Sequence, residues 1–367
     1  MAGGIGSRFW PMSQADNPKQ FIDIMGIGQS MLQTTFHRFE EICPRENIFI
    51  VTGREWVRHV HEQIPGLNRW QVLSEPFRRN TAPCIAYAAA IINTFNPEAN
   101  IIVSPSDHVI FGDSSFKSDM AKALQIAGGR QWIVTLGVKP TNPAISYGYI
   151  QFDMDDNRQR GLDGYGLPEK IEDLYRVRTF TEKPPREIAE TFIESGEYYW
   201  NTGIYVWSLP VLKAAYRQYL PGLATFFSKV TLDTPDSEVE RIYTLSEAIS
   251  VDVGIMEKAG NVCGFLASFR WSDVETWETL YNTCSPNEAG NRIVGDNVFT
   301  YDVKDTIVHV PDGLTIVLEG LEGYIVAGDR NTLLICRRDA EDRIVKFVSD
   351  VELAQVSPRK HKNKQEK

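Results

Sequence analysis

The sequence predicts an α/β domain with a mostly parallel sheet, followed by a small all-β domain. From Ser30 to about residue 137, apolar residues occur alternately at helical spacing and in short extended runs such as NIFIVTG and NIIVSPSDH. Strands separated by helices of this length favour parallel pairing, with crossover helices on the sheet faces. Beyond the segment SPNEAGN, short apolar stretches are interrupted by Gly320, Gly323 and Gly328, without a helical period until the end of the chain. This second pattern is typical of short strands.

The expected elements follow in order along the first domain. A helix begins after Ser30, its predicted N-cap, and the strand NIFIVTG follows it. Helices are expected over residues 55–64 and 82–95, with the strand QVLSEP between them and NIIVSPSDH after them. Between residues 139 and 210 the strands YGYIQFD, YRVRTFTEKP and YYWNTGIYVW predict an antiparallel insertion or extension of the sheet. Helices over residues 209–219 and 237–258, the strand NVCGFLASF and a short helix after Asp273 complete the domain.

These patterns set the expected domain boundaries. The first domain is predicted over residues 1–285 and the second over residues 286–355, and residues 356–367 form a charged tail that is expected to be disordered. An all-β unit this small buries only one face of its strands by itself, so the first domain or a second subunit must cover it. A homodimer is therefore one expected arrangement.

Composition excludes several classes of protein. The chain has 38 basic and 48 acidic residues and a net charge of -10, which argues against a general nucleic-acid binder but leaves phosphorylated small molecules open as ligands. Its 5 cysteines are scattered without a C-x-x-C pair, so neither a disulfide framework nor a zinc site is expected. Apolar runs fall short of the roughly 18 residues that a membrane span needs. The cytoplasm is the expected location.

The N-terminal segment MAGGIGSRFWPMSQADNPKQF carries the first candidate site. Gly3, Gly4 and Gly6 allow backbone N–H groups to face phosphate oxygens, while Arg8 and Lys19 can supply positive charge. The glycine spacing is neither G-x-G-x-x-G nor that of a Walker loop. A tight turn with two solvated surface cations is the alternative interpretation.

Taken together, G-G-x-G-x-R-x-W-P and the later P-K resemble the signature of the sugar-1-phosphate nucleotidylyltransferases, most closely the mannose-1-phosphate guanylyltransferases. Further motifs occur in the order of that family, namely SEPFRRNTAP, VSPSDH, FTEKP, WNTGIYVW and WSDVETW. The resemblance implies a Rossmann-like nucleotidyltransferase domain followed by a left-handed β-helix-like domain. It further implies nucleotidyl transfer from GTP to mannose 1-phosphate, with Mg²⁺ or another divalent cation as cofactor. The isomerase domain of long bacterial members is expected to be absent.

The resemblance also implies residue roles. Arg8 and Lys19 match the catalytic cations, and Asp107 and Asp273 match the metal-binding carboxylates. Both aspartates could instead be helix N-caps. The remaining matches are expected to bind the nucleotide (Ala2, Gly3, Gly4, Gly6, Glu75, Arg79, Asn80, Thr81) or the sugar phosphate (Gly148, Glu182, Lys183, Asn201). Guanine presents two N–H donors on one edge, so a carboxylate would favour it, and Glu75 is the candidate, with Asn80 as the alternative.

The chain departs from the family pattern at a few positions. Ile145 and Ser146 replace a threonine and a glycine near the sugar, and Glu275 and Thr276 stand where the family has D-V-G-S-W. The chain also begins at Met1, directly before the glycines, where a central apolar strand normally precedes such a loop, so we expect the natural protein to begin upstream. Another hexose-1-phosphate nucleotidylyltransferase, or a non-catalytic nucleotide-sugar-binding protein, remains an alternative. A nicotinamide oxidoreductase is disfavoured by the missing third spaced glycine.

Overall fold

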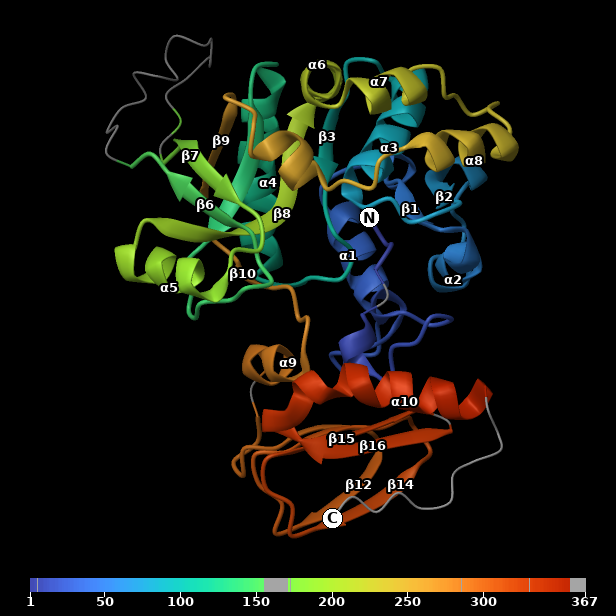
Figure 1. The fold of residues 1–367 in the computed structure, drawn as a ribbon, viewed down its shortest axis with the longest axis vertical. Helices are drawn as coiled ribbons and strands as arrows, with labels where there is room; N and C mark the ends of the chain where they lie inside the picture. The colour runs from blue at the N-terminus through green and yellow to red at the C-terminus, as the bar shows by residue number, and fades with distance from the viewer. Residues whose placement is uncertain (5, 155–170, 172, 285, 330, 357–367) are drawn as a thin grey trace. The chain divides into compact units, whose positions relative to one another are not determined.

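The computed structural model describes the chain except for residues 5, 155–170, 172, 285, 330 and 357–367 (Figure 1). The expected disordered tail therefore lies almost wholly outside the described residues. The chain forms two compact units that alternate along the sequence. Unit 1 comprises Met1–Gly3 and Thr35–Trp271, and unit 2 comprises Gly4–Thr34 and Ser272–Lys367. The glycine-rich segment thus passes from one unit to the other between Gly3 and Gly4.

A six-stranded sheet in the order β3-β8-β5-β9-β7-β6 forms the centre of unit 1, and β6 also pairs with β8. Its strands are β3 (Asn100–Val103), β5 (Ile133–Val138), β6 (Tyr149–Phe152), β7 (Tyr175–Thr181), β8 (Tyr198–Ser208) and β9 (Val262–Leu266). Within this sheet, β5 and β9 are parallel, whereas the other described pairings are antiparallel. The antiparallel insertion is confirmed, but the prediction of a mostly parallel sheet is wrong. The physical reason is that β8 lies between β3 and β5 and runs antiparallel to both.

The pairing of β8 with β5 is irregular. Thr135 is opposite Tyr205, but Gly137 is opposite Asn201, so β8 carries extra residues between these two pairs. Gly203, in the middle of this bulge, has a φ of 69°, a left-handed conformation that glycine adopts without a steric penalty. The bulge brings the side chains of Asn201 and Tyr205 into hydrogen-bonding contact.

Two shorter strands of unit 1, β1 (Ile50–Gly53) and β2 (Val72–Glu75), pair in parallel. Met1 and Ala2 extend this arrangement, because the Ala2 N–H donates to the Val51 carbonyl at 2.8 Å. On the other side, the amino terminus of Met1 donates to the carbonyl of Ser104 at 2.9 Å, just beyond β3. Gly3 therefore lies at the carboxyl end of β1, the edge at which α/β sheets bind ligands.

Helices cover both faces of the central sheet (Figure 1). Side chains of α3, α6, α7 and α8 share one buried cluster with Tyr205 and Trp207, whereas α4 and α5 share another with Ile204 and Val206. This alternation along β8 is the period of two that a strand imposes. The helices of the unit are α2 (Val57–Gln63), α3 (Thr81–Phe95), α4 (Asp113–Gly128), α5 (Arg186–Ser195), α6 (Leu209–Tyr219), α7 (Pro221–Phe227) and α8 (Asp236–Leu245). The short strands β4 (Val109–Phe111) and β10 (Arg270–Ser272) pair separately.

Several helix predictions can be compared with these bounds. Helix α1 (Met31–Glu40) follows Ser30, which caps it as predicted, since the Gln33 N–H donates to the Ser30 hydroxyl at 3.2 Å. The bounds of α6 agree with the predicted helix over residues 209–219. The helix predicted over residues 237–258 is wrong in extent, because α8 ends at Leu245 and a separate π-helical turn covers Asp252–Met256. None of the described helices is long and apolar enough to cross a membrane.

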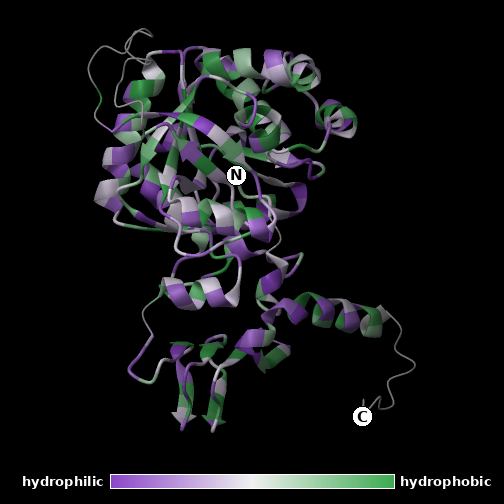
Figure 2. Cartoon of the chain, turned by 60° about the vertical axis from the view of Figure 1, so that its left-hand side comes forward, coloured by the Kyte–Doolittle hydropathy of each residue, from purple (hydrophilic) through white to green (hydrophobic). Residues whose placement is uncertain are grey.

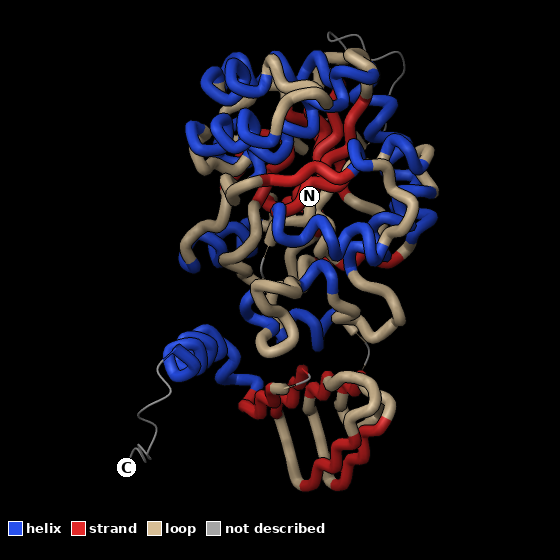
Figure 3. Tube along the Cα trace, turned by 90° about the vertical axis from the view of Figure 1, so that its right-hand side faces the viewer, coloured by secondary structure: helices blue, strands red, loops and turns tan. Residues whose placement is uncertain are grey.

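Unit 2 contains short, mainly parallel strands. Strands β11 (Arg292–Val294), β13 (Ile307–His309) and β15 (Tyr324–Asp329) pair in parallel, and β16 (Thr332–Arg337) pairs antiparallel to β15. A second parallel pair is formed by β12 (Asn297–Tyr301) and β14 (Thr315–Glu319). Figure 3 shows these strands in red, stacked and joined by loops. Val308, Leu318 and Val326 are among the residues buried between the strands.

The prediction of an all-β unit is wrong at its C-terminal end. Arg338–Arg343 form 3₁₀ turns and α10 (Ile344–Val356) follows, the helix that leads to the C-terminus in Figure 2. Hydrophilic and hydrophobic residues are mixed along this helix (Figure 2). Ile344 is buried, but Val345 and Leu353 are exposed. The apolar residues of α10 therefore do not form a single buried face, and the sequence lacks the helical spacing that would have predicted this helix.

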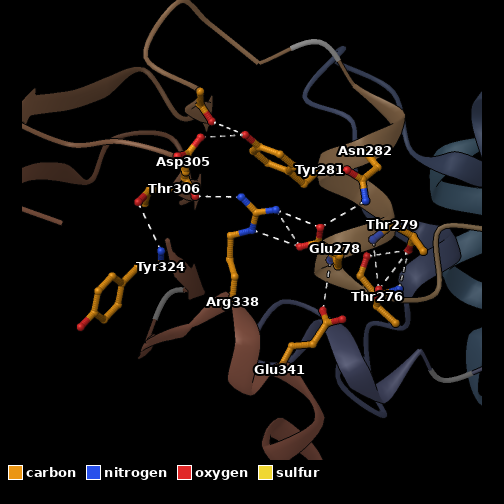
Figure 4. A network of polar contacts seen from close by, with 11 residues as sticks. Thr276, Glu278, Thr279, Tyr281, Asn282, Asp305, Thr306, Tyr324, Arg338 and Glu341 are labelled. Atoms are coloured by element: carbon orange, nitrogen blue, oxygen red, sulfur yellow. Dashed lines mark hydrogen bonds and ion pairs between the residues drawn. The ribbon is translucent and has the colours of Figure 1, made fainter. Parts of the chain in front are cut away.

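A polar network fastens helix α9 (Trp277–Thr283) to the strands of unit 2 (Figure 4). The Arg338 guanidinium donates to the Glu278 carboxylate at 2.7 Å and to the carbonyl of Asp305 at 2.9 Å. It also lies over the ring of Tyr281, at 3.7 Å from the ring centroid. The start of α9 is fixed by Thr276, whose side chain accepts from the Thr279 N–H. The loop before α9 is thereby held at its C-terminal end.

Candidate active site

The predicted site residues fall in both units. Unit 2 contains Gly4, Gly6, Arg8, Lys19 and Asp273, and unit 1 contains Ala2, Gly3, Glu75, Arg79, Asn80, Thr81, Asp107, Gly148, Glu182, Lys183 and Asn201. Within unit 1 the residues lie at four places, namely the carboxyl ends of β1 and β2, the start of α3, the loop after β3, and the junction of β6, β7 and β8.

The segment before α3 is held by several hydrogen bonds within unit 1. The Asn80 side chain caps α3 by accepting from the Thr81 N–H at 2.9 Å, and Asn80 itself has a φ of 67°. The Thr81 hydroxyl accepts from the N–H of Val251 at 2.9 Å, and Arg79 Nε donates to the carbonyl of Tyr243 at 3.0 Å. These contacts bring Arg79, Asn80 and Thr81 together in one fixed turn.

Glu75 is buried at the end of β2. Its Oε1 accepts from the Tyr243 hydroxyl at 3.1 Å, and a Cβ at Gly3 would lie 3.6 Å from its Oε2. Burial raises the pKa of Glu75 to about 7, although the hydrogen bond from Tyr243, the amino terminus and Arg78 each lower it. The structure thus brings Gly3 and Glu75 together. It also gives Glu75 a carboxyl group that changes charge near neutral pH.

Gly148, Glu182 and Asn201 meet where β6 pairs with both β7 and β8. The Asn201 N–H donates to the Gly148 carbonyl at 2.8 Å. A Cβ at Gly148 would lie only 2.7 Å from Glu182 Oε2 and 3.4 Å from Asn201 Cβ, so a larger residue would displace the carboxylate. Lys183 lies next to this cluster with a φ of 46°, and its ammonium is 3.8 Å from Glu182 Oε1. The four predicted sugar-phosphate residues are therefore neighbours.

Three residues behind this cluster were not predicted from the sequence. The Thr135 hydroxyl donates to Asn201 Oδ1 at 3.0 Å, and Asn201 Nδ2 donates to the Tyr205 hydroxyl at 2.7 Å. The Tyr205 hydroxyl in turn donates to Asp252 Oδ1 in a short hydrogen bond. Burial raises the pKa of both Tyr205 and Asp252. A single acid within the apolar run from Val251 to Met256 was the signal that could have identified Asp252.

Asp107 lies in the loop between β3 and β4, beside His108, whose Nδ1 accepts from Trp271 Nε1 at 3.1 Å. The N-cap interpretation is wrong for Asp107, because the next helix, α4, begins at Asp113 after its N-cap Gly112. It is also wrong for Asp273, because Thr276 caps α9. Both aspartates thus lie in loops, and neither is the N-cap of a helix.

In unit 2, Lys19 is buried with 4% exposure, so the interpretation as a solvated surface cation is wrong for this residue. Its ammonium donates to the carbonyls of Asp273 at 3.0 Å and Val274 at 3.1 Å. Gly6 packs against it, since a Cβ there would lie 2.6 Å from Lys19 Cβ. Arg8 is half exposed and forms an ion pair of 3.2 Å with Glu275. Gly6, Lys19 and Asp273 are therefore brought together, and Arg8 is paired in the same region of unit 2.

Backbone strain marks three of the predicted motifs. Asn80, Lys183 and Val274 have φ values of 67°, 46° and 43°, a region that non-glycine residues seldom adopt. Val274 is the most unusual because it is β-branched and buried. Such strain persists where surrounding contacts fix the backbone, and it is common at functional sites. The bonds from Lys19 to Asp273 and Val274 supply that fixation in the WSDVETW motif.

Comparison with known proteins identifies the family. A family profile described as "Nucleotidyl transferase" matches residues 1–288. This chain belongs to the nucleotidyltransferase family. Its relatives include the mannose-1-phosphate guanylyltransferases of Escherichia coli, 29% identical over 96% of this chain and 75% of the relative, and of Klebsiella pneumoniae, 31% identical over 95% and 72%. A crystal structure of a mannose-1-phosphate geranyltransferase from Thermus thermophilus has a TM-score of 0.81 and 26% identity, and the match covers 96% of this chain and 98% of that one.

These matches confirm the α/β nucleotidyltransferase fold and show that the chain is an enzyme of this type. The chain spans about three quarters of the length of the E. coli relative. Nucleotidyltransferases of this family generally use divalent metal ions. Among the described residues there is no group of three or more His, Cys, Asp or Glu side chains that could hold a metal ion. Mg²⁺ commonly uses one or two carboxylates together with water and substrate phosphates, so the two loop aspartates suit it by their chemistry.

Proposed function

We propose that this nucleotidyltransferase transfers a guanylyl group from GTP to mannose 1-phosphate, giving GDP-mannose and pyrophosphate. The observation that carries the proposal is the convergence of Gly148, Glu182, Lys183 and Asn201, which come from three separate motifs of the sequence. The names of relatives that match nearly the whole chain support the same substrates.

The reaction is an in-line displacement at the α-phosphorus of GTP. A phosphate oxygen of mannose 1-phosphate forms the new P–O bond, and the bond from the α-phosphorus to the bridging oxygen of pyrophosphate breaks, so the electron pair leaves with pyrophosphate. Chemistry of this kind needs positioning and charge neutralisation, and a protein nucleophile is not required. We assign Arg8 and Lys19 to the neutralisation of charge on the triphosphate.

The metal would be held by Asp107 and Asp273, and it would neutralise and orient the phosphates. Lys19 has a second task in this assignment, because its bonds to the carbonyls of Asp273 and Val274 fix the loop that carries one of these carboxylates. The backbone at Ala2, Gly3, Gly4 and Gly6 would cradle the triphosphate. Glu75 would pair with the guanine edge, and Asn80, at the start of α3, is the alternative.

At the sugar end, Lys183 would bind the phosphate of mannose 1-phosphate. Its side chain is 57% exposed, while its weak pair with Glu182 at 3.8 Å keeps the ammonium near the cluster. Glu182 and Asn201 offer acceptors and donors to sugar hydroxyls. The absence of a side chain at Gly148 lets the Glu182 carboxylate lie directly against the backbone there.

Three further features belong to this proposal. The parallel pairing of β11, β13 and β15, and of β12 and β14, supports a short β-helix-like arrangement in unit 2. Tyr301 and Val317 expose apolar side chains on the second of these sheets, which is consistent with a homodimer. The cysteines of the described chain are free thiols, consistent with a cytoplasmic enzyme.

A substrate matrix tests the function. Pyrophosphate release is measured for four triphosphates, each with mannose, glucose or fucose 1-phosphate, with Mg²⁺ and with excess chelator as the control. We expect the highest kcat/KM for GTP with mannose 1-phosphate and no release with chelator. A preference for another pair would assign a different hexose-1-phosphate nucleotidylyltransferase. Tight binding of GDP-mannose without release for every pair would instead indicate a binding protein.

A further inference from the structure

Four side chains behind the sugar-phosphate cluster form one continuous chain of hydrogen bonds. It runs from the Thr135 hydroxyl to Asn201 Oδ1, from Asn201 Nδ2 to the Tyr205 hydroxyl at 2.7 Å, and from that hydroxyl to Asp252 Oδ1. Thr135, Asn201 and Tyr205 are buried, whereas Asp252 is partly buried at the start of the π-helical turn. The bulge at Gly203 allows Asn201 and Tyr205 to meet although they belong to one strand.

The Thr135 hydroxyl can form a hydrogen bond with the Asn201 amide in either orientation of that amide. The Thr135 hydroxyl donates to Asn201 Oδ1 as observed, but it also lies 3.2 Å from the carbonyl of Ile204. If the amide were turned over, Thr135 could donate to Ile204 and accept from Asn201 Nδ2. A hydroxyl both donates and accepts, so Thr135 does not decide the orientation.

Asp252, at the other end of these hydrogen bonds, determines the orientation of the Asn201 amide. An ionised carboxylate can only accept, so the Tyr205 hydroxyl must give its hydrogen to Asp252 and can only accept from Asn201. Asn201 Nδ2 is therefore held on the side of Tyr205, near Gly148, where a Cβ would be 3.6 Å away. With the amide turned over, a carbonyl oxygen would take that place and would lie on the side of the Glu182 carboxylate.

We propose that Asp252 is a positioning residue, which holds the Asn201 amide in the orientation that receives the sugar phosphate. It acts through the Tyr205 hydroxyl and also directly, because its Oδ1 accepts from Asn201 Nδ2 at 3.5 Å. Burial raises the pKa of Asp252, whereas the hydrogen bond from Tyr205 and, to a smaller extent, the positive charge of Lys183 lower it, and Glu257 raises it. The same carboxylate thus links the amide that meets the sugar to the cation that meets its phosphate. This inference rests on the proposed function.

The test compares Asp252→Asn, Tyr205→Phe and the double variant in full-length protein. An asparagine at this position can donate as well as accept, so it no longer fixes the direction of the chain, and phenylalanine interrupts the chain. We expect each single change to raise KM for mannose 1-phosphate about tenfold and to leave KM for GTP within about twofold, as loss of one oriented hydrogen bond predicts. The double variant should resemble Asp252→Asn, because both contacts that orient the amide, through Tyr205 and directly, end on the Asp252 carboxylate.

Tyr216→Phe is the matched control. Tyr216 is another buried tyrosine, and its hydroxyl donates to the carbonyl of Ala82 at 2.7 Å, away from Asn201. It should leave KM for mannose 1-phosphate unchanged. Melting temperatures of all variants show whether each one is folded. If Asp252→Asn does not fold, Tyr205→Phe carries the test, since it leaves the carboxylate in place.

Equal effects on both substrates, additive effects in the double variant, or a wild-type KM in folded Asp252→Asn would overturn the inference. Failure of the proposed function has a different outcome. If the wild-type enzyme prefers another sugar 1-phosphate, the selective rise in KM should appear with that sugar phosphate. If wild-type protein releases no pyrophosphate with any pair, the proposed function and this inference both fall.

Discussion

The Arg8 guanidinium lies 3.2 Å from the Glu275 carboxylate. Arg8 is one of the two cations assigned to the triphosphate, and Glu275 stands where the family pattern has a glycine. If Arg8 binds the triphosphate as proposed, the Glu275 carboxylate competes with phosphate oxygens for its guanidinium. A bound triphosphate must displace this carboxylate or tolerate its negative charge.

Glu275→Gln should consequently improve binding of GTP. An exposed ion pair contributes at most about 1 kcal/mol, so we expect KM for GTP to fall by no more than about fivefold, with KM for mannose 1-phosphate unchanged. Steady-state kinetics at low salt measure both constants. Glu319→Gln, on the exposed face of β14, is the control for loss of one negative charge. A rise in KM for GTP would mean that Glu275 helps to orient Arg8.

Asp107→Asn should preserve the fold but lower kcat on the order of a hundredfold or more. An amide oxygen neutralises a divalent cation far less well than a carboxylate does. The measurement is a titration of activity with Mg²⁺, accompanied by a thermal melt, and Asp312→Asn on an exposed turn is the control. Near-normal activity at saturating metal would remove Asp107 from the metal site.

Lys183→Ala should raise KM for mannose 1-phosphate by about tenfold or more and leave KM for GTP nearly unchanged. The lost group is the ammonium that lies 3.8 Å from the Glu182 carboxylate in the cluster of Gly148, Glu182 and Asn201. Lys229→Ala, an exposed lysine after α7, is the matched control. Equal changes in the two constants would contradict the assignment to the sugar phosphate.

Glu75→Gln should change the pH dependence of stability. The pKa of Glu75 is raised from 4.5 to about 7 by burial, so the folded protein keeps this proton over a range in which the unfolded chain has lost it. Its contribution to stability is therefore fully present below pH 4.5 and is lost as pH rises towards 7. Glutamine does not titrate, so the variant should gain on the wild type across this window, by an amount on the order of 3 kcal/mol. Melting curves at intervals from about pH 4 to 8 measure the difference, and parallel curves would refute the shift.

Arg338→Ala should destabilise unit 2. The change removes the bonds to Glu278 and Asp305 and the contact with the Tyr281 ring (Figure 4). We expect a melting temperature lower by roughly 2 to 4 °C, as a loss near 1 kcal/mol predicts. Arg337→Ala is the control, because Arg337 is exposed and pairs with Asp339 two residues away. If both changes lowered the melting temperature equally, the network would have no special role.

The sequence predicted those features that depend on local pattern. The Ser30 cap, the bounds of α6 and the antiparallel insertion all follow from short-range spacing, and the structure confirms them. The mostly parallel sheet was wrong because the position of β8 between β3 and β5 depends on long-range pairing, which periodicity cannot encode. The hydrogen bonds of Tyr205 and Asp252 were missed for the same reason, since their meeting depends on tertiary packing of the π-helical turn.

The bulge around Gly203 interrupts the regular hydrogen bonds of the sheet but brings Asn201 into contact with Tyr205. A strand without the extra residues would form a continuous ladder with β5, and the sheet would gain regular hydrogen bonds. The same repair would move Asn201 away from Tyr205 and dissolve the contact that fixes its amide. A deletion between Asn201 and Tyr205 could therefore yield a protein that melts higher and turns over poorly. At this position, a change that increases the stability of the fold would therefore be expected to lower the rate of the proposed reaction.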